Sequence, residues 1–78
     1  MDNLIALIKE KYPKLSKGHK AIASYIIDHY DKAAFLTASK LGEEAGVSES
    51  TVVRFPLELG FDGYPSFQKE LNGLIKSK

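Results

Sequence analysis

Residues 37–60 read TASKLGEEAGVSESTVVRFPLELG, and the first half of this stretch predicts a short helix with a marked beginning and end. Thr37 is a good N-cap, because its hydroxyl can accept a hydrogen bond from a free amide of the first turn. Apolar residues then recur at helical spacing on one face, namely Ala38, Leu41 and Ala45. Gly46 follows where the chain needs a positive φ, which costs glycine almost nothing. Gly42, four residues earlier, has no side chain to obstruct a second helix that crosses closely.

The second half of the stretch predicts another helix after a tight turn. Val47 occupies the corner, and Ser48 can cap the new helix. The residues that face inward have helical spacing: Val52, Phe55 and Leu59. A small residue, a glycine turn and apolar residues at fixed offsets are typical of a helix-turn-helix. An ordinary helical hairpin is the competing interpretation.

The composition bounds the class of protein. A chain of 78 residues predicts one small domain over residues 1–78, and a hydrophobic fraction of 44% is adequate for a core. The absence of cysteine excludes disulfides and cysteine zinc sites. No apolar run approaches the ~18 residues of a membrane span. Residues 1–14 lack the features of a secretory signal, so we expect a cytoplasmic protein with no membrane partner.

The net charge of +1 is unevenly distributed. Residues 1–20 hold five lysines against two acidic residues, whereas residues 37–60 hold Lys40 and Arg54 against four glutamates. A polyanion should therefore be drawn to the amino-terminal third at least as strongly as to the helix-turn-helix.

The segment before the helix-turn-helix is also predicted to be helical. Residues 3–11 predict an amphipathic helix that ends before Pro13, because the residue before a proline is pushed out of the helical region. A longer helix is expected from its N-cap Ser16 to about Tyr30. Apolar residues cover so much of its surface that it should lie centrally, with neighbours on two sides.

The remaining elements complete an all-α fold. Asp31 is expected to cap a short third helix that carries Phe35 and Leu36. An Asp-Gly turn follows the helix-turn-helix, and Pro65 suits the first turn of a last helix. The predicted inward face of that helix is Phe67, Leu71, Leu74 and Ile75. The predicted architecture is a compact bundle of five to six short helices containing a homeodomain-like helix-turn-helix.

Pro56 conflicts with a regular second helix. It lacks the amide that would bond to the Val52 carbonyl oxygen, and its ring crowds that oxygen. The cost in a helix interior is about 3 kcal/mol relative to alanine. We therefore expect the regular helix to end or kink near Arg54–Phe55, with residues 57–59 in a tighter turn before Gly60.

The chain resembles the amino-terminal domain of the RpiR family of bacterial transcription regulators in three segments: SKGHKAIASYI, the Gly46-Val47-Ser48 turn, and VVRF followed by LGFDGYPSFQ. The resemblance runs from about Leu4 to Leu74. In that family a helical DNA-binding domain precedes a sugar-isomerase-type (SIS) domain that senses a phosphorylated sugar. The resemblance implies that the SIS domain is absent from this chain, and that a phosphosugar effector acts only through a missing C-terminal domain.

The chain departs from the family pattern at two places. Between Arg-Phe and Leu-Gly the family tends to carry a small residue and two basic residues, whereas this chain has Pro56-Leu57-Glu58. This departure bears on phosphate contacts at the end of the second helix. Near Ser16 the family often has a glutamate that would complete a capping box, and this chain has Gly18-His19. The second departure implies a less firmly started central helix.

In a helix-turn-helix the second helix enters the major groove with its amino-terminal side chains at the base edges. The candidates for base contacts are Glu49, Ser50, Thr51, Val53 and Arg54. Arg54 could bind guanine O6 and N7, or a phosphate, and its alternative is a surface pair with Glu58. Ser50 and Thr51 could equally be simple capping residues. For Glu49 we favour a role at the positive helix end over a contact to cytosine N4.

The candidates for contacts to the DNA backbone are Lys17, His19, Lys20, Thr37, Ser39, Lys40, Ser48 and Tyr64. The basic group near Ser16 stands at a helix start, where free amides also attract phosphate. A solvated basic face is the equal alternative for that group. Tyr64 could donate its hydroxyl to the backbone, although an aromatic residue before a proline more often serves packing.

No enzymatic activity, metal or cofactor is expected. The chain has two histidines, and nothing in it resembles a two-histidine metal helix or a glycine-rich phosphate loop. His29 and Asp31 could offer two metal ligands, but we favour a helix-end histidine stabilised by the helix dipole.

The helix-turn-helix pattern predicts a domain that binds a specific double-stranded DNA operator as a homodimer, and the resemblance implies that it belongs to a sugar-responsive transcription regulator. The alternative is a helical self-association module with weak or lost DNA binding. The acidic helix-turn-helix and the exposed position of Leu57 support this alternative.

Overall fold

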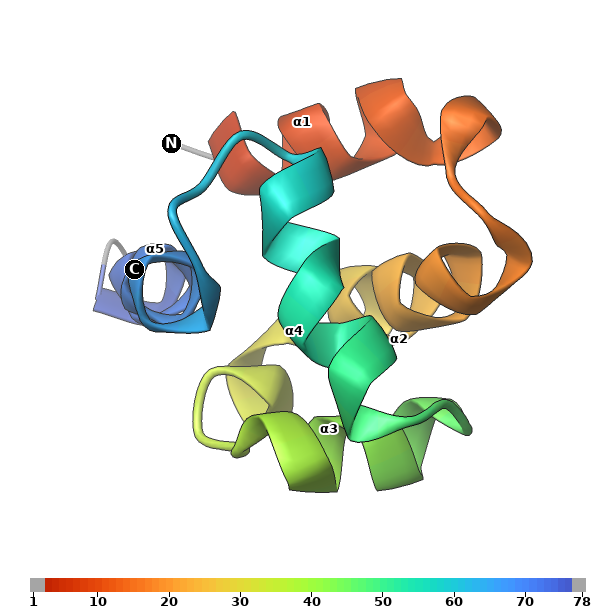
Figure 1. Cartoon of the computed structure of the whole chain (residues 1–78). Helices are drawn as coiled ribbons and strands as arrows, with labels where there is room; N and C mark the ends of the chain where they lie inside the picture. The colour runs from red at the N-terminus through yellow and green to blue at the C-terminus, as the bar shows by residue number, and fades with distance from the viewer. Residues whose placement is uncertain (1–2, 77–78) are drawn as a thin grey trace.

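The computed structural model describes the backbone of residues 3–76 and the side chains of residues 4–74. Within that range the chain forms five α-helices, one 3₁₀ turn and no strand. The elements are α1 (Asn3–Lys11), η1 (Tyr12–Lys14), α2 (Lys17–Ala33), α3 (Ala38–Ala45), α4 (Glu49–Glu58) and α5 (Tyr64–Lys76). Figure 1 shows these helices packed in a compact bundle, with α4 crossing in front of α2 and α3 at one end. The predicted all-α class is confirmed.

The helix α2 is the centre of the bundle. Its N-cap is Ser16, whose Oγ accepts a hydrogen bond from the amide of His19 at 3.4 Å, without a glutamate to complete a capping box. Its buried residues are Ile22, Ala23, Ile26 and Ala33. Because α2 contacts α1, α3, α4 and α5, its predicted central position is confirmed.

The end of α2 differs from the prediction. No separate third helix begins at Asp31, because the chain departs from helical geometry only at His29 (φ −137°, ψ 45°) and resumes at once, to Ala33. Asp31 lies inside this last part of α2 and accepts a hydrogen bond from the Lys32 amide at 2.9 Å. Phe35 is 75% exposed in the segment that follows.

The helices α3 and α4 form the predicted helix-turn-helix. Thr37 and Ser48 are the N-caps, and each hydroxyl accepts a hydrogen bond from the amide three residues on. Gly46 has a φ of 80°, and the amides of Gly46 and Val47 both donate to the carbonyl oxygen of Gly42 at 2.8 Å. A Cβ added to Gly42 would stand 2.7 Å from the carbonyl oxygen of Val47, so the predicted close approach is also confirmed.

The helix α4 does not break at Arg54–Phe55, so that prediction is wrong. The helix runs to Glu58 with Pro56 inside it and fully buried. The proline stands in the last turn, where its carbonyl oxygen accepts from the amides of Leu59 and Phe61, both at 3.0 Å. Gly60, with a φ of 95°, donates to Leu57 O at 3.1 Å, which completes a Schellman ending, and Leu57 and Glu58 stay in the α-helix rather than in the expected tighter turn. The missing amide thus removes one hydrogen bond without ending the helix early.

The helix α5 is joined to the segment between α2 and α3. The hydroxyl of Tyr64 donates to the carbonyl oxygen of Leu36 at 2.9 Å. The amide of the Gln68 side chain donates to the same oxygen at 2.8 Å and to Ala34 O at 3.3 Å. Phe67, Leu71 and Leu74 are buried as predicted, whereas the side chain of Ile75 lies outside the described residues. These contacts hold α5 against the start of the helix-turn-helix.

Gly42→Ala should destabilise the domain, by about 1–3 kcal/mol, because its methyl would meet backbone that cannot move without opening the turn. Gly73→Ala is the matched control: it is also a helical glycine, and nothing lies within 4 Å of an added Cβ. It should raise the free energy of unfolding by about 0.5–1 kcal/mol. Urea unfolding followed by circular dichroism measures both. Equal effects of the two substitutions would contradict the close approach at Gly42.

Tyr64→Phe should lower the free energy of unfolding by about 0.5–1.5 kcal/mol at neutral pH, because one hydrogen bond is lost. Burial raises the pKa of the Tyr64 hydroxyl above its ordinary value of about 10. Since the folded state favours the protonated form, its contribution is complete below that value and is lost as the pH rises through the raised pKa. The variant should therefore lose less stability above pH ~10 than the wild type. Identical alkaline profiles in unfolding experiments would contradict this role.

Candidate nucleic-acid interface

The helix α4, the second or recognition helix of the helix-turn-helix, buries one face and exposes the other. Its inward residues are Val52, Phe55 and Pro56, and Leu59 follows at the C-cap. On the outside, a shallow depression is lined by Glu49, Ser50, Val53 and Arg54. Four of the five residues predicted to contact bases therefore share one surface.

Thr51, the fifth, lies apart from that surface. It is half-buried, and its methyl group faces α2, where a Cβ added to Gly18 would lie 3.2 Å from it. Its hydroxyl is 2.9 Å from Ser48 Oγ, which is also 3.1 Å from the hydroxyl of Ser50. Of the two interpretations of Thr51, this geometry favours capping.

Arg54 has no ion pair or side-chain hydrogen bond among the residues that the structure describes. It is exposed, and the alternative pair with Glu58 does not form. The guanidinium can therefore meet a ligand without first breaking an internal contact. A planar group with five donors matches the paired acceptors of guanine or the oxygens of a phosphate.

The start of α2 lies beside the start of α4. Gly18 suits this approach, because an added Cβ would lie only 3.2 Å from the Thr51 methyl carbon, although its 3.8 Å distance to Val47 Cγ1 would be an ordinary contact. Lys17 is exposed, and Lys20 Nζ lies 5.5 Å from the centroid of the Tyr12 ring. The ring of His19 makes an edge contact with Phe55 at 5.6 Å, so this side chain takes part in packing.

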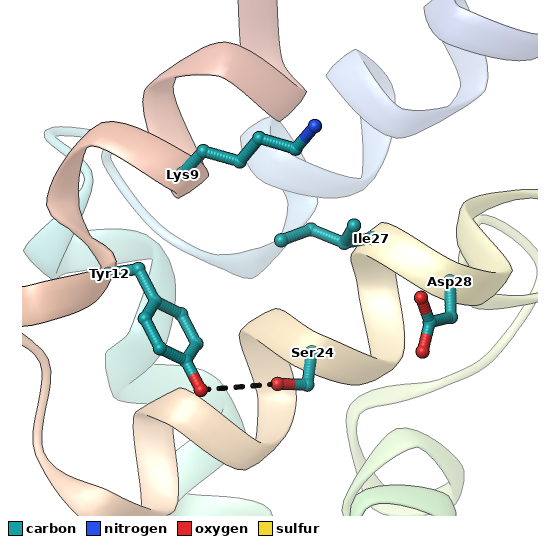
Figure 2. A pocket seen from close by; sticks show the side chains of 5 residues that line it. All are labelled: Lys9, Tyr12, Ser24, Ile27 and Asp28. Atoms are coloured by element: carbon teal, nitrogen blue, oxygen red, sulfur yellow. Dashed lines mark hydrogen bonds between the residues drawn. The ribbon is translucent and has the colours of Figure 1, made fainter.

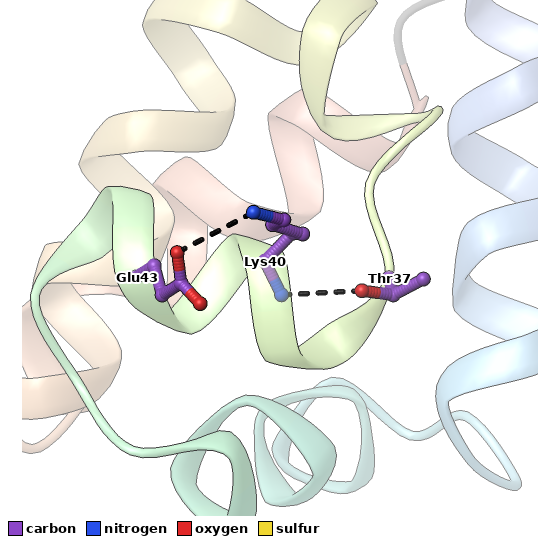
Figure 3. Close-up of polar contacts among 3 residues, drawn as sticks. All are labelled: Thr37, Lys40 and Glu43. Carbon is purple, nitrogen blue, oxygen red and sulfur yellow. Dashed lines mark hydrogen bonds and ion pairs between the residues drawn. The ribbon is translucent and has the colours of Figure 1, made fainter.

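The start of α3 carries three of the residues predicted to contact the DNA backbone. Figure 3 shows Thr37 Oγ1 accepting from the Lys40 amide at 3.2 Å, and Lys40 Nζ 3.7 Å from a carboxylate oxygen of Glu43. Both charged side chains are about two-thirds exposed (66% and 65%), so their attraction is weak and a phosphate can compete for the lysine. Ser39, which lies between Thr37 and Lys40 in the sequence, is exposed.

Tyr64 differs from the other predicted backbone contacts. Its hydroxyl proton is used in the bond to Leu36 O, so the half-buried side chain has no free donor for a phosphate while that bond is made. The geometry favours packing, the second of the two interpretations that the sequence allowed.

Two features of this region were not predicted. The contact between Gly18 and Thr51 joins residues far apart in the chain, and Gly18-His19 had indicated only a less firmly started central helix. The two bonds from Gln68 likewise join α5 to the loop before α3. No local pattern signals either contact, because each depends on how the helices pack.

A separate pocket lies between the first helical segment and α2. Figure 2 shows its lining residues, Lys9, Tyr12, Ser24, Ile27 and Asp28, with the Tyr12 and Ser24 hydroxyls 3.4 Å apart. None of them belongs to the surface predicted to bind DNA. Among residues 3–76, no helix is long and apolar enough to cross a membrane.

The fold and this surface define a helix-turn-helix domain whose recognition helix exposes Glu49, Ser50, Val53 and Arg54 on one face. Residues 2–78 match the helix-turn-helix domain of the rpiR family. The chain therefore belongs to the rpiR family, and the resemblance found in the sequence is confirmed.

Similar curated proteins are transcription regulators. An uncharacterised regulator of Escherichia coli K12, YfhH, is 34% identical over 76 residues, which are 97% of this chain and 27% of YfhH. The regulator HexR of Pseudomonas aeruginosa is 32% identical over 71 residues, or 91% of this chain and 25% of HexR. The regulator GlvR of Bacillus subtilis is 34% identical over 62 residues, or 80% of this chain and 24% of GlvR.

The chain spans about a quarter of the length of these relatives. No solved structure matches it significantly. Family, fold and relatives together place the chain among the DNA-binding domains of transcription regulators.

Lys17→Ala and Lys20→Ala should each weaken binding to any DNA duplex and lower the slope of log affinity against log salt by about 1. The expectation follows from the position of both lysines at the helix start that adjoins α4. Fluorescence anisotropy at several salt concentrations measures the slope. Lys69→Ala, on the exposed side of α5, is the charge-matched control and should leave the slope unchanged. An unchanged slope in both α2 variants would remove these lysines from the interface.

Proposed function

We propose that this chain binds a specific site on double-stranded DNA by placing α4 in the major groove. The observation that carries the proposal is Arg54, exposed and without an internal partner among the described residues, on a helix whose opposite face is buried. A buried inner face fixes the direction of the helix, and an unpaired guanidinium on the outer face supplies a selective donor.

The base contacts in this proposal come from the exposed residues of the first two turns of α4. Arg54 donates to O6 and N7 of a guanine, and Ser50 donates to a neighbouring acceptor. Val53 meets an apolar group of the groove, and Glu49 stands at the positive helix end, where it can also accept from cytosine N4. Thr51 supports this set from behind through the hydroxyl cluster with Ser48.

The phosphate contacts come from the helix starts around α4. Lys17 and Lys20 flank it from α2, and Thr37, Ser39 and Lys40 from α3. The amino-terminal third carries the positive surplus, whereas residues 37–60 carry a deficit, so the lysines of residues 1–20, with Lys17 and Lys20 among them, supply most of the attraction to DNA. His19 and Tyr64 hold these elements in place through Phe55 and Leu36.

The finer parts of the proposal concern the whole protein. We propose that it acts inside the cell as a homodimer and answers to a phosphosugar through a domain outside this chain. The chain's resemblance to the RpiR family supports the sugar response. The greater length of the relatives leaves room for a second domain. A dimer would place two copies of α4 about one helical turn of DNA apart.

A self-association module is the second candidate function, because α4 also exposes apolar side chains. Val53 is 43% exposed and Leu57 is 54% exposed. The salt dependence of binding distinguishes the two candidate functions. DNA binding weakens steeply as salt is raised, whereas apolar self-association does not.

Arg54→Ala should leave the fold intact and weaken binding to a duplex selected from a randomised library by about 1–3 kcal/mol, the scale of one bidentate base contact. Arg54→Lys keeps the charge but loses the paired donors, so it should recover only a small part of that loss. Lys69→Ala removes the same charge from α5 and should bind like the wild type. Anisotropy titrations measure affinity, and circular dichroism checks folding. Wild-type affinity of a folded Arg54→Ala variant would show that Arg54 does not read the site.

A further inference from the structure

Two of the three large apolar side chains that the structure shows exposed lie on α4. They are Val53 (43%) and Leu57 (54%), and the third is Phe35, in the segment before α3. Because α4 continues without a break through Pro56 to Glu58, Leu57 stays on the same helix as Arg54. A helix that ended near Arg54–Phe55 would have left Leu57 outside it.

The exposed residues Ser50, Val53, Arg54 and Leu57 form one stripe. At about 100° per residue they fall within roughly 100° of the helix surface. Their spacing of i, i+3, i+4 and i+7 is also that of the base-reading residues on the recognition helix of homeodomains. Val53 and Leu57 form one edge of the stripe, and Arg54 forms the other. The stripe is therefore continuous with the surface proposed above for base contacts.

The groups that DNA presents in its major groove indicate what this apolar edge can contact. Among the base edges in the major groove, the apolar group is the C5 methyl of thymine. Val53 and Leu57 are one turn apart, which is about 6 Å along the helix and close to two base-pair steps of 3.4 Å. Two such methyl groups on nearby base pairs can thus be covered by the two side chains.

A protein partner fits this edge less well. A stable protein interface buries about 800 Å² on each partner. Two half-exposed side chains on one helix, with Glu49 and Glu58 at the flanks, offer only a narrow strip. The helix, about 10–12 Å across with its side chains, matches the ~12 Å width of the major groove.

We propose that Val53 and Leu57 read thymine methyl groups beside the guanine contacted by Arg54. This inference rests on the proposed function and extends it. It adds Leu57 to the specificity-determining residues and predicts a binding site with thymines within about two base pairs of that guanine.

Removing single methyl groups from the DNA tests the inference. A duplex selected by the wild-type chain from a randomised library is resynthesised with deoxyuridine at one thymidine at a time, which deletes a methyl and leaves the base pairing unchanged. One covered methyl is worth about fourfold in Kd. We expect a loss of about that size at one or two thymidines near the guanine.

The same duplexes are then titrated with Leu57→Ala and Val53→Ala. Each variant should lose sensitivity to the one deoxyuridine that faces its own position and keep sensitivity to the other. Phe35→Ala is the matched control, because it removes an exposed apolar side chain outside α4 and should leave both sensitivities intact. Circular dichroism checks that every variant is folded.

Several results would overturn the inference. If no deoxyuridine changes the affinity of the wild-type chain, but Arg54→Ala still weakens binding, methyl reading is rejected. The proposed function then stays in place. Retained methyl sensitivity in Leu57→Ala, with self-association lost in sedimentation, would assign Leu57 to a protein contact. If the wild-type chain enriches no duplex over the random library, both the proposed function and this inference fail.

Discussion

The direction of the recognition helix depends on the lack of a side chain at Gly42. An added Cβ would come within 2.7 Å of the Val47 carbonyl oxygen, closer than packed atoms allow. The carbonyl oxygen of Gly42 also accepts from the amides of Gly46 and Val47. One residue therefore supplies both the space and the acceptor for the turn. Because α4 begins two residues after Val47, the geometry of this turn sets where every exposed residue of α4 points.

Aromatic packing holds the buried face of α4 in place, and the opposite face stays exposed. The Phe55 ring makes edge contacts with His19 of α2 and with Phe67 of α5, both at 5.6 Å. These contacts join three helices through one side chain. A reading helix gains from such support, because side chains on a rigid element lose little freedom when they bind. Phe55 is thus buried on the inner side of α4, while Arg54, its neighbour in sequence, is exposed on the outer side.

In our proposal, the charge distribution separates the residues that attract DNA from those that select the site. Residues 37–60 are acidic overall, so the recognition helix adds little general attraction to a polyanion. The lysines at the start of α2 can supply it, since Gly18 lets that helix start adjoin α4. Phosphate contacts position a protein and base contacts specify a site. In our proposal these tasks therefore fall to different helices that meet at Gly18 and Thr51.

The sequence by itself determined the helix ends that are set by residues close together in the chain. Thr37, Ser48 and Gly46 were identified correctly, because a cap bonds to amides or carbonyls within four residues along the chain. Only the tertiary structure showed that α4 continues through Pro56, that α2 runs to Ala33, and that Gly18 lies against Thr51. The intrinsic cost of proline predicted a break, but burial of its ring and the Schellman ending at Gly60 accompany a continuous helix to Glu58. That continuity puts Leu57 on the exposed stripe. Contacts between residues distant in the chain depend on how whole helices pack, and local patterns do not encode them.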